Sequence, residues 1–340
     1  MNTSNLTVLD TLPEGITEVK ATELHKILPT PTLVHLPGRT ENPMFVSVLQ
    51  HGNEETGLLA IQALLRKYQS KQLPRSLSIF FGNIDAAKQG SRKLDGQPDY
   101  NRVWPGTEQP PTKESSNAQQ IVNEMKEREV FISLDVHNNT GINPHYACIN
   151  TLDTAFLHLA NLFGRFVVYF IRPKGVQSAA FAELCPAVTL ECGKPGVQYG
   201  VEHAFEYLDS CLHLSQIPDH PVAPQDIDLF HTVSQVCIPD HVSFSFQENT
   251  ADLMLSNDLE RMNFTEIRVG TEFGHVNLPD ILPVVATNEH GNEITADYFT
   301  VTEGRLVCCK PVMPSMLTLN EDVIRQDCLC YLMERIKLPS

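Results

Sequence analysis

The first two thirds of the chain alternate short apolar runs with longer segments of helical periodicity, and this alternation constrains the fold most. Strand-like apolar runs occupy residues 45–49, 77–81, 130–136, 166–171 and 187–191. Apolar residues recur at helical spacing in residues 56–70, 117–129, 153–163 and 200–214. Uninterrupted apolar strands that alternate with helices are typical of a sheet covered on both faces. The sequence therefore predicts an α/β fold.

The pattern changes after residue 214. Residues 215–230 hold three prolines and show no periodicity, so we interpret this segment as a linker. Beyond it come β-branched runs separated by Gly, Pro, Asn and Asp, at residues 233–238, 242–246, 281–287 and 294–301. This texture predicts a larger domain over residues 1–215 and a smaller, mostly β domain over residues 225–340.

The charge balance limits the partners of the chain. It carries 25 Lys+Arg against 41 Asp+Glu, a formal net charge of -16. Nucleic acids and anionic membranes bind to cationic surfaces, so we expect neither as a partner. An anionic substrate would have to be held by a few local cations against the overall field.

Two further features favour a cytoplasmic protein. The first residues, MNTSNLTVLDTLPEG, lack the basic region and apolar run of a secretory signal. The nine cysteines include no CxxC pair, and a chain of 340 residues can build a full core without disulfides. We expect reduced thiols and a cytoplasmic location.

The segment MFVSVLQHGNEETG is the most informative for chemistry. An apolar strand ends there, and His51 and Glu54 lie in the loop before the next helix. A loop at the carboxyl edge of an α/β sheet is the usual place for a functional site. Imidazole nitrogens and carboxylate oxygens both bind zinc, and two ligands close in sequence bind it at a low entropic cost. His51 and Glu54 are therefore candidate metal ligands.

A third ligand is offered by the segment VFISLDVHNNTG. His137 stands at the end of another buried strand, where a polar residue needs a reason. Asp135 lies two residues earlier, on the same face of the strand. It could accept a hydrogen bond from the second nitrogen of His137 and so fix the orientation of that ligand.

The tetrapeptide HGNE occurs a second time, at residues 290–293. This copy lies between two β-like runs, and neither a helix nor a further histidine is expected after it. We interpret His290, Gly291 and Asn292 as residues of a hairpin turn rather than as a metal site.

Glu191 ends an apolar strand in the segment PAVTLECGKPG, just before a Gly-Lys-Pro-Gly turn. A carboxylate at a strand end near a metal can act as a general base toward a water molecule. Considered alone, Glu191 is equally consistent with a solvated residue at the start of a loop.

A long polar loop, FFGNIDAAKQGSRKLDGQPDYNRVWPG, concentrates positive charge. It contains Arg92, Lys93, Asn101 and Arg102. The planar guanidinium of arginine binds carboxylates through two parallel hydrogen bonds. In so acidic a chain this loop is a candidate anion site, although the segment by itself would favour an ordinary solvated surface.

Four motifs occur in a characteristic order: HGNE at 51, DYNR at 99–102, DVHNNTG at 135 and TLECGKPG at 189. With them the sequence resembles the succinylglutamate desuccinylase/aspartoacylase family of zinc-dependent amidohydrolases, which are relatives of the zinc carboxypeptidases. The resemblance covers essentially the whole chain. It implies a zinc-carboxypeptidase-like mixed sheet flanked by helices, with a C-terminal β domain that narrows the site entrance. It also implies one Zn²⁺ per chain and a small anionic N-acyl amino acid as substrate.

The resemblance implies the catalytic roles. His51, Glu54 and His137 would bind the zinc, and a water would take the fourth position. Glu191 would accept the proton of that water and pass it to the leaving amine. Arg92 would stabilise the oxyanion with the zinc, and Lys93 is the alternative, because Arg92 stands further from DYNR than is usual in the family.

The resemblance also implies how substrate is held. Asn101 and Arg102 would grip a substrate carboxylate, and Asn83 matches the Gly-Asn that follows the second strand in the family. The stretch VQSAAFAEL lacks the Tyr and Arg that aspartoacylases carry before the catalytic Glu, so N-acetylaspartate is not implied. The sequence leaves open whether three other residues enter the site: Arg172, Lys174 and Tyr298.

Three hypotheses follow. The leading one is hydrolysis of the amide bond of a small N-acyl amino acid. The second is a zinc carboxypeptidase acting on small peptides, which would use the same ligands and base. The third is a non-catalytic metal-binding or ligand-sensing protein, which would need a lost ligand or base. We expect a locally positive pocket around the basic loop and the metal. The acyl group, the amino acid and the formation of a homo-oligomer are left open.

Overall fold

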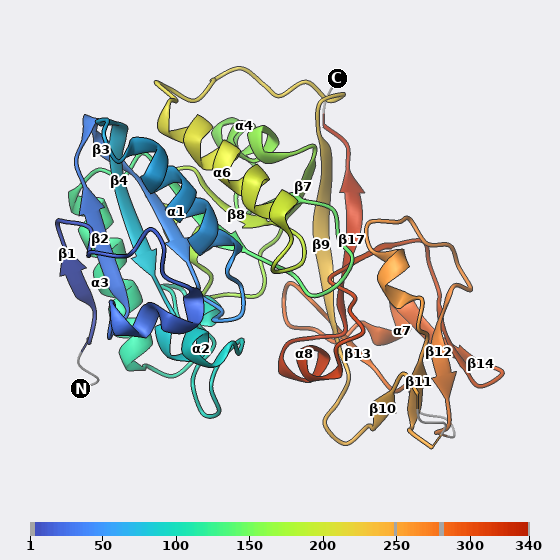
Figure 1. The fold of residues 1–340 in the computed structure, drawn as a ribbon. Coiled ribbons are helices and arrows are strands. Elements are labelled where there is room, and N and C mark those ends of the chain that lie inside the picture. Colours follow the sequence, from blue (N-terminus) through green and yellow to red (C-terminus); the bar gives the residue numbers. More distant parts are fainter. Residues whose placement is uncertain (1–3, 248–249, 279–281, 339–340) are drawn as a thin grey trace.

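The computed structural model describes residues 4–247, 250–278 and 282–338, and their strands form two sheets (Figure 1). The larger sheet consists, in spatial order, of β1 (Thr7–Leu9), β2 (Thr32–Leu36), β4 (Leu73–Phe81), β3 (Gly38–Val48), β5 (Ile132–His137), β8 (Ala187–Glu191), β6 (Tyr146–Ile149), β7 (Phe166–Tyr169), β9 (Asp228–Cys237), β17 (Cys330–Ile336) and β16 (Met313–Ser315). β13 (Val285–Asn288) pairs with β9 beside this path. The smaller sheet consists of β10 (Phe244–Ser245), β11 (Leu253–Leu255), β12 (Glu272–Val276), β15 (Arg305–Cys308) and β14 (Phe299–Thr302).

Helices connect and cover these strands. They are α1 (Thr56–Tyr68), α2 (Ile84–Gln89), α3 (Lys113–Glu127), α4 (Thr154–Phe163), α5 (Gln177–Phe181), α6 (Gln198–Leu212), α7 (Thr295–Tyr298) and α8 (Glu321–Gln326). Short 3₁₀ helices occur at Ala21–Lys26, Tyr100–Arg102 and Leu259–Met262. In the described part of the chain, none of the helices has the length and apolarity needed to cross a membrane.

The central strand β3 contacts helical layers on both faces, because successive side chains of a strand point to opposite sides. Val48 faces α1, where Gly57 lies so close that an added Cβ would be 2.9 Å from a Val48 methyl. Phe45 faces the other way and stacks on Phe181 of α5, with ring centroids 4.6 Å apart. Trp104 packs edge-on against both of these rings. The predicted α/β sheet covered on both faces is confirmed.

The carboxyl ends of β3, β5 and β8 lie along one edge of the larger sheet. These three strands are parallel neighbours. Their register pairs Ser47 with Asp135, and His137 with Glu191. Polar side chains at the ends of strands that are otherwise apolar are thus brought to a common edge. β6 runs antiparallel to β8, so the sheet is mixed, as expected.

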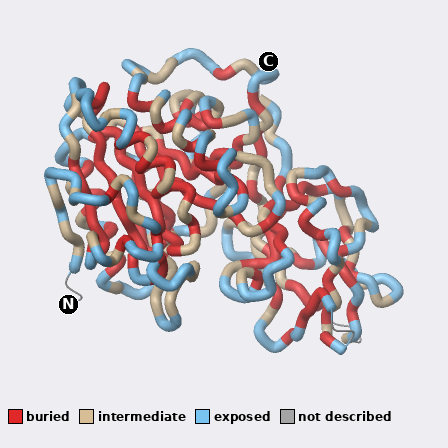
Figure 2. The backbone as a smooth tube through the Cα atoms, in the orientation of Figure 1, coloured by how far each residue is buried: buried red, intermediate tan, exposed pale blue. Residues whose placement is uncertain are grey.

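The C-terminal third of the chain takes part in both sheets. β9 pairs in parallel with β7 and antiparallel with β17, so the larger sheet continues past residue 225, the expected start of the second domain. A separate apolar core surrounds Phe273 and Phe299. Figure 2 shows buried segments through the middle of the larger sheet and a second buried group in the C-terminal part.

Two local expectations need correction. The expected linker at residues 215–230 ends earlier, because Asp228 already begins β9. The run 294–301, expected as one strand, forms α7 followed by β14, so a short helix does follow the second HGNE. The Thr295 hydroxyl accepts a hydrogen bond from the Ala286 N–H at 3.0 Å, which turns the chain at this point. The first residue of the run 281–287 lies outside the described residues.

A chain that ends at residue 224 should fail to fold. It loses β9, which pairs with β7, and it exposes Tyr146 and Val168, which pack against Phe230. An unpaired strand edge with exposed apolar side chains promotes aggregation. We expect the truncated chain to lack a near-UV circular dichroism signal, whereas the full chain should unfold in urea in one cooperative transition. A truncated chain with a native near-UV spectrum would contradict this prediction.

Candidate metal centre and cavity

The loop after β3 and the end of β5 bring three candidate metal ligands together. His51 and Glu54 come from the loop, and His137 is the last residue of β5. One ligand atom from each lies within 4.8 Å of the other two, and all three residues are buried. Among the described residues this is the one group of His, Cys, Asp and Glu that could hold a metal ion.

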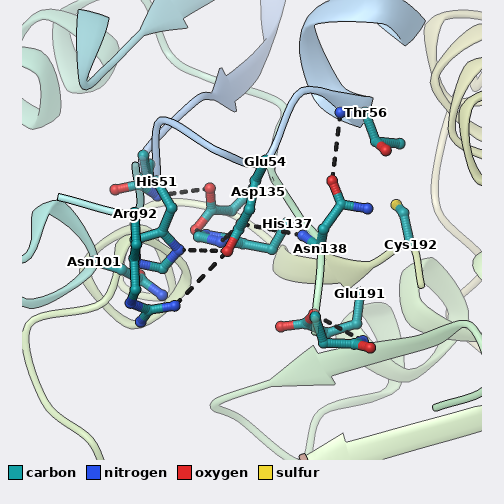
Figure 3. A network of polar contacts seen from close by, with 12 residues as sticks. His51, Glu54, Thr56, Arg92, Asn101, Asp135, His137, Asn138, Glu191 and Cys192 are labelled. Carbon is teal, nitrogen blue, oxygen red and sulfur yellow. Dashed lines mark hydrogen bonds and ion pairs between the residues drawn. The ribbon is translucent and has the colours of Figure 1, made fainter. Parts of the chain in front are cut away.

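Glu54 stands between the two imidazoles (Figure 3). Its Oε1 is 2.8 Å from Nδ1 of His51, and its Oε2 is 2.8 Å from Nδ1 of His137. The backbone N–H of Asn138 donates to the same Oε2 at 3.1 Å. The two Nδ1 atoms and the carboxylate therefore point toward a common centre.

The other nitrogen of each imidazole is held by an aspartate. Nε2 of His51 lies 3.0 Å from Oδ1 of Asp99, and Nε2 of His137 lies 2.9 Å from Oδ2 of Asp135. Asp135 also accepts from Ser47, at 2.6 Å. An aspartate that faces Nε2 favours the proton on that nitrogen, which leaves the Nδ1 lone pair free to bind a metal.

The arrangement fits a bound cation. With Nε2 protonated, three acceptors converge: two Nδ1 lone pairs and the Glu54 carboxylate. Burial would raise the pKa of Glu54, but the two imidazoles hold it well below its usual range. Burial opposes charge on His137, yet Asp135 and Glu54 outweigh it and raise its pKa well above the usual value. The site thus demands positive charge, and two His and one Glu suit a zinc-type metal.

Glu191 lies beside this cluster but outside the ligand set. It ends β8, opposite His137 in the strand register, and it lines the same cavity. Its Oε2 accepts a hydrogen bond from Asn139 Nδ2 at 3.3 Å. Burial raises the pKa of Glu191 to about 7, while His137 opposes the shift. A carboxyl group with such a pKa can both accept and release a proton near neutrality.

The basic loop supplies the next wall of the cavity, which measures about 700 Å³ including its open mouth. Arg92, Asn101 and Arg102 all line it. Arg92 Nη1 lies 3.8 Å from Oε1 of Glu54, beside the candidate ligands. The side-chain oxygen of Asn101 is buried without a hydrogen-bond partner. The structure therefore places these three predicted residues together with His51, Glu54 and His137, which form the candidate metal cluster.

Asn83, predicted to bind substrate, does not line the cavity. It is fully buried and caps α2, accepting a hydrogen bond from the Ala86 N–H at 3.1 Å. Its Nδ2 donates to Gln97 Oε1 at 2.9 Å. The Gly-Asn that follows β4 therefore begins α2, and the hydrogen bond from Asn83 to Gln97 holds the basic loop in position.

The three residues left open by the sequence lie in different places. Arg172 lines the cavity. Lys174 pairs with Glu108 at 3.0 Å and lies outside the cavity lining. Tyr298 lies away from the cavity, with the Lys310 ammonium 4.2 Å from its ring centroid.

The resemblance implies that the C-terminal domain narrows the site entrance, but sequence reasoning did not identify which residues of that domain line the cavity. Ser315, Met316, Asp327 and Tyr331 complete its lining. They stand in no recognisable motif, and their nearness to the metal cluster depends on how β16 and β17 join the larger sheet. The second HGNE contributes nothing here, since His290 lies in a turn with 72% of its side chain exposed.

Comparison with known families agrees with this geometry. Residues 43–204 match the model of the succinylglutamate desuccinylase/aspartoacylase catalytic domain. Residues 43–204 of this chain belong to that family. The matched stretch contains the metal cluster, Glu191 and the basic loop, so the resemblance seen in the motifs is confirmed. Comparison with curated protein sequences gives no significant match.

Solved structures extend the similarity of fold beyond the family domain. The succinylglutamate desuccinylase from Chromobacterium violaceum is 21% identical, with a TM-score of 0.57 over 89% of this chain and 87% of that one. Murine aminoacylase 3 is 15% identical, with a TM-score of 0.58 over 88% and 97%. The product-bound ectoine utilization protein EutE (DoeB) from Ruegeria pomeroyi is 16% identical, with a TM-score of 0.56 over 90% and 88%. The fold of this family therefore also covers the C-terminal third.

The two copies of HGNE provide a matched test of the metal site. Glu54→Gln removes the central charge of the buried cluster, whereas Glu293→Gln makes the same change at an exposed position just after a turn. We expect the wild type and Glu293→Gln to retain about one equivalent of metal after dialysis, and Glu54→Gln to lose most of it. Elemental analysis by mass spectrometry gives the metal content. Equal metal in both variants would contradict the assignment.

Proposed function

We propose that this chain is a zinc-dependent hydrolase of the amide bond of a small N-acyl amino acid. The observation that carries the proposal is the placement of Glu191 beside the His51–Glu54–His137 cluster, in one cavity and at one sheet edge. The family of hydrolytic deacylases to which residues 43–204 belong supports the same reaction class.

The ligand set favours zinc. Structural and catalytic zinc sites use His and Glu ligands, and catalytic sites keep a position open beside three protein ligands. When bound, zinc supplies a Lewis acid that polarises the acyl carbonyl and makes water more acidic. His51, Glu54 and His137 would hold it through two Nδ1 atoms and the carboxylate, each imidazole being oriented by an aspartate.

Glu191 would move the proton of the reaction. As a carboxylate it accepts a proton from the attacking water, and as a carboxylic acid it donates that proton to the nitrogen of the leaving amine. The new C–O bond forms as the carbonyl opens to an oxyanion, and the scissile C–N bond breaks as the carbonyl re-forms, so water is consumed and a carboxylic acid and an amine are formed. A pKa of about 7 suits both halves of this exchange.

The basic loop would orient the substrate. Arg92, whose guanidinium lies beside Glu54, would stabilise negative charge on the acyl oxygen. Arg102 and the amide of Asn101, which line the same cavity, would hold the carboxylate of the amino acid. Contacts to the acyl oxygen and to the carboxylate would fix the substrate on either side of its amide bond. Binding would then align this bond with the attacking water.

The C-terminal segment favours a small substrate over a peptide. Met316, Asp327 and Tyr331 line the same cavity as the metal cluster and so close one side of it. A carboxypeptidase needs room for the chain that precedes the scissile bond. The similar solved structures include a succinylglutamate desuccinylase and an aminoacylase, which agrees with acyl amino acids.

Glu191→Gln should abolish turnover but keep the metal. The amide is nearly isosteric with the carboxylate but cannot accept a proton, so we expect kcat to fall by about 10²–10⁴-fold. The measurement is hydrolysis of a panel of N-acetyl and N-succinyl amino acids, with metal content determined on the same samples. Full zinc loading without hydrolysis of any member by the wild type would refute the function. Preferential cleavage of dipeptides would favour the carboxypeptidase.

The pH profile of kcat/KM should show an acidic limb that belongs to Glu191. The free carboxyl has a pKa raised to about 7 by burial. A divalent cation nearby favours the carboxylate and lowers that pKa, so the limb should lie at or below about pH 7, with activity lost as pH falls through it. The profile is measured on zinc-loaded protein between about pH 5 and 9, with metal content checked at each point. A limb well above neutrality would contradict this role.

A further inference from the structure

A carboxylate of the chain itself, that of Asp327, lies between Arg92 and Arg102, two of the arginines that line the cavity. Oδ1 of Asp327 is 3.3 Å from Nη2 of Arg102, and its Oδ2 is 3.4 Å from Nη2 of Arg92. Only 16% of the Asp327 side chain is exposed. Charges in so enclosed a place are screened little by solvent or salt.

The position of Asp327 is fixed by the fold. Its N–H donates to the Val323 carbonyl of α8 at 3.0 Å, and its own carbonyl accepts from the Cys237 thiol at 3.7 Å. Arg325, in the last turn of α8, anchors the helix by donating to backbone carbonyls of three residues: Ile238, Pro239 and Val242. The carboxylate is therefore a built part of the cavity wall.

Every arginine in the described lining of the cavity already has a carboxylate partner. Arg92 and Arg102 share Asp327, and Arg172 binds Glu108 through both Nη atoms at 2.9 and 3.0 Å. The lining also contains as many carboxyl groups as arginines: Glu54, Glu191 and Asp327 against Arg92, Arg102 and Arg172. The positive pocket expected from the sequence would thus depend on the charge of the metal.

One substrate carboxylate can still be bound. Arg102 has five N–H donors, of which Nη1 donates to the Asn101 carbonyl and Nη2 to Asp327. With the remaining donors taken by the first carboxylate, a second one would meet Arg92, which Asp99 and Asp327 already pair, or Arg172, which Glu108 pairs. Repulsion between like charges in a partly buried site disfavours that arrangement.

The remaining wall of the cavity suits an apolar group. Besides the polar side chains of Asn138, Thr189, Thr232 and Ser315, it consists largely of aromatic, aliphatic and sulfur-containing side chains: Tyr146, Cys148, Val168, Phe170, Val176 and Met316. Such a surface gains free energy by excluding water from an apolar partner, and it offers few hydrogen bonds to a charged one.

We propose that the site takes N-acyl amino acids with a single carboxylate and an apolar remaining group, and that Asp327 sets this preference. The inference rests on the proposed function for the nature of the substrate. Asp327 acts by filling the place between the arginines that a second carboxylate would need, so it excludes dicarboxylic acyl amino acids. The C-terminal segment thereby determines specificity as well as closing the cavity.

The test compares N-acetylmethionine with N-acetylglutamate, and N-acetylglutamine with N-acetylglutamate. The last pair has nearly the same shape and differs by one charge. In zinc-loaded wild type we expect kcat/KM for N-acetylmethionine to exceed that for N-acetylglutamate by at least about tenfold. A wild type that prefers N-acetylglutamate would overturn the proposal without any variant.

Asp327→Asn removes the charge and keeps the size of the side chain. We expect the ratio of kcat/KM for N-acetylglutamate to that for N-acetylglutamine to rise by about tenfold or more. Asp327→Glu should keep the wild-type ratio, because it keeps the charge. Asp322→Asn is the matched control, since it makes the same charge change at an exposed position of α8. An unchanged ratio in folded Asp327→Asn, or an equal change in Asp322→Asn, would contradict the role of Asp327.

Measurements of binding distinguish a failure of this inference from a failure of the proposed function on which it rests. Calorimetry with zinc-loaded Glu191→Gln, with and without Asp327→Asn, measures the affinity for the same three compounds in the absence of turnover. Hydrolysis of none of the panel by the wild type would refute the proposed function. Tighter binding of N-acetylglutamate than of N-acetylglutamine to Glu191→Gln with Asp327 intact would refute the selectivity alone.

Discussion

The parallel pairing of β3, β5 and β8 is the constraint on which the candidate site depends. Its register places His137 opposite Glu191 and brings the loop that carries His51 and Glu54 to the same edge. A shift of one residue in a strand would turn its side chains to the opposite face, so the buried apolar faces of these strands also fix the direction of the polar ends. The metal cluster thus owes its geometry to hydrophobic packing as much as to its own loop.

Carboxylates and imidazoles alternate along a hydrogen-bonded network in the site, and their opposite charges stabilise one another. The network runs through five side chains: Asp99, His51, Glu54, His137 and Asp135. A buried charge is costly unless it is paired, and here each acidic group faces an imidazole. Removal of one member takes an opposite charge from each of its neighbours, so the members of the network are energetically coupled. A metal at its centre replaces protons that the two imidazoles would otherwise hold.

The sequence was sufficient where the signal is local. Hydrophobic periodicity predicts the central strands and helices, and a polar residue at the end of an apolar strand pointed to His137 and Glu191. The sequence was insufficient where the position of a residue in the site depends on the pairing of strands that lie far apart in the chain. Asp327 reaches the cavity only because β17 joins β9, and no local pattern reports that pairing. Asn83 shows a different limit, because Gly-Asn after a strand is equally typical of a helix cap and of a site residue.

Strand β9 links the two apolar cores, since Leu229 belongs to the first and Val236 to the second. The cavity is also walled by residues from both parts, so a ligand within it binds only the assembled chain. Its binding free energy then adds to the stability of the whole, by about 2.7 kcal/mol at a concentration of 100 times Kd. The C-terminal core would gain stability from an occupant that it does not touch. The amount of folded protein in a cell would accordingly vary with the supply of metal and substrate.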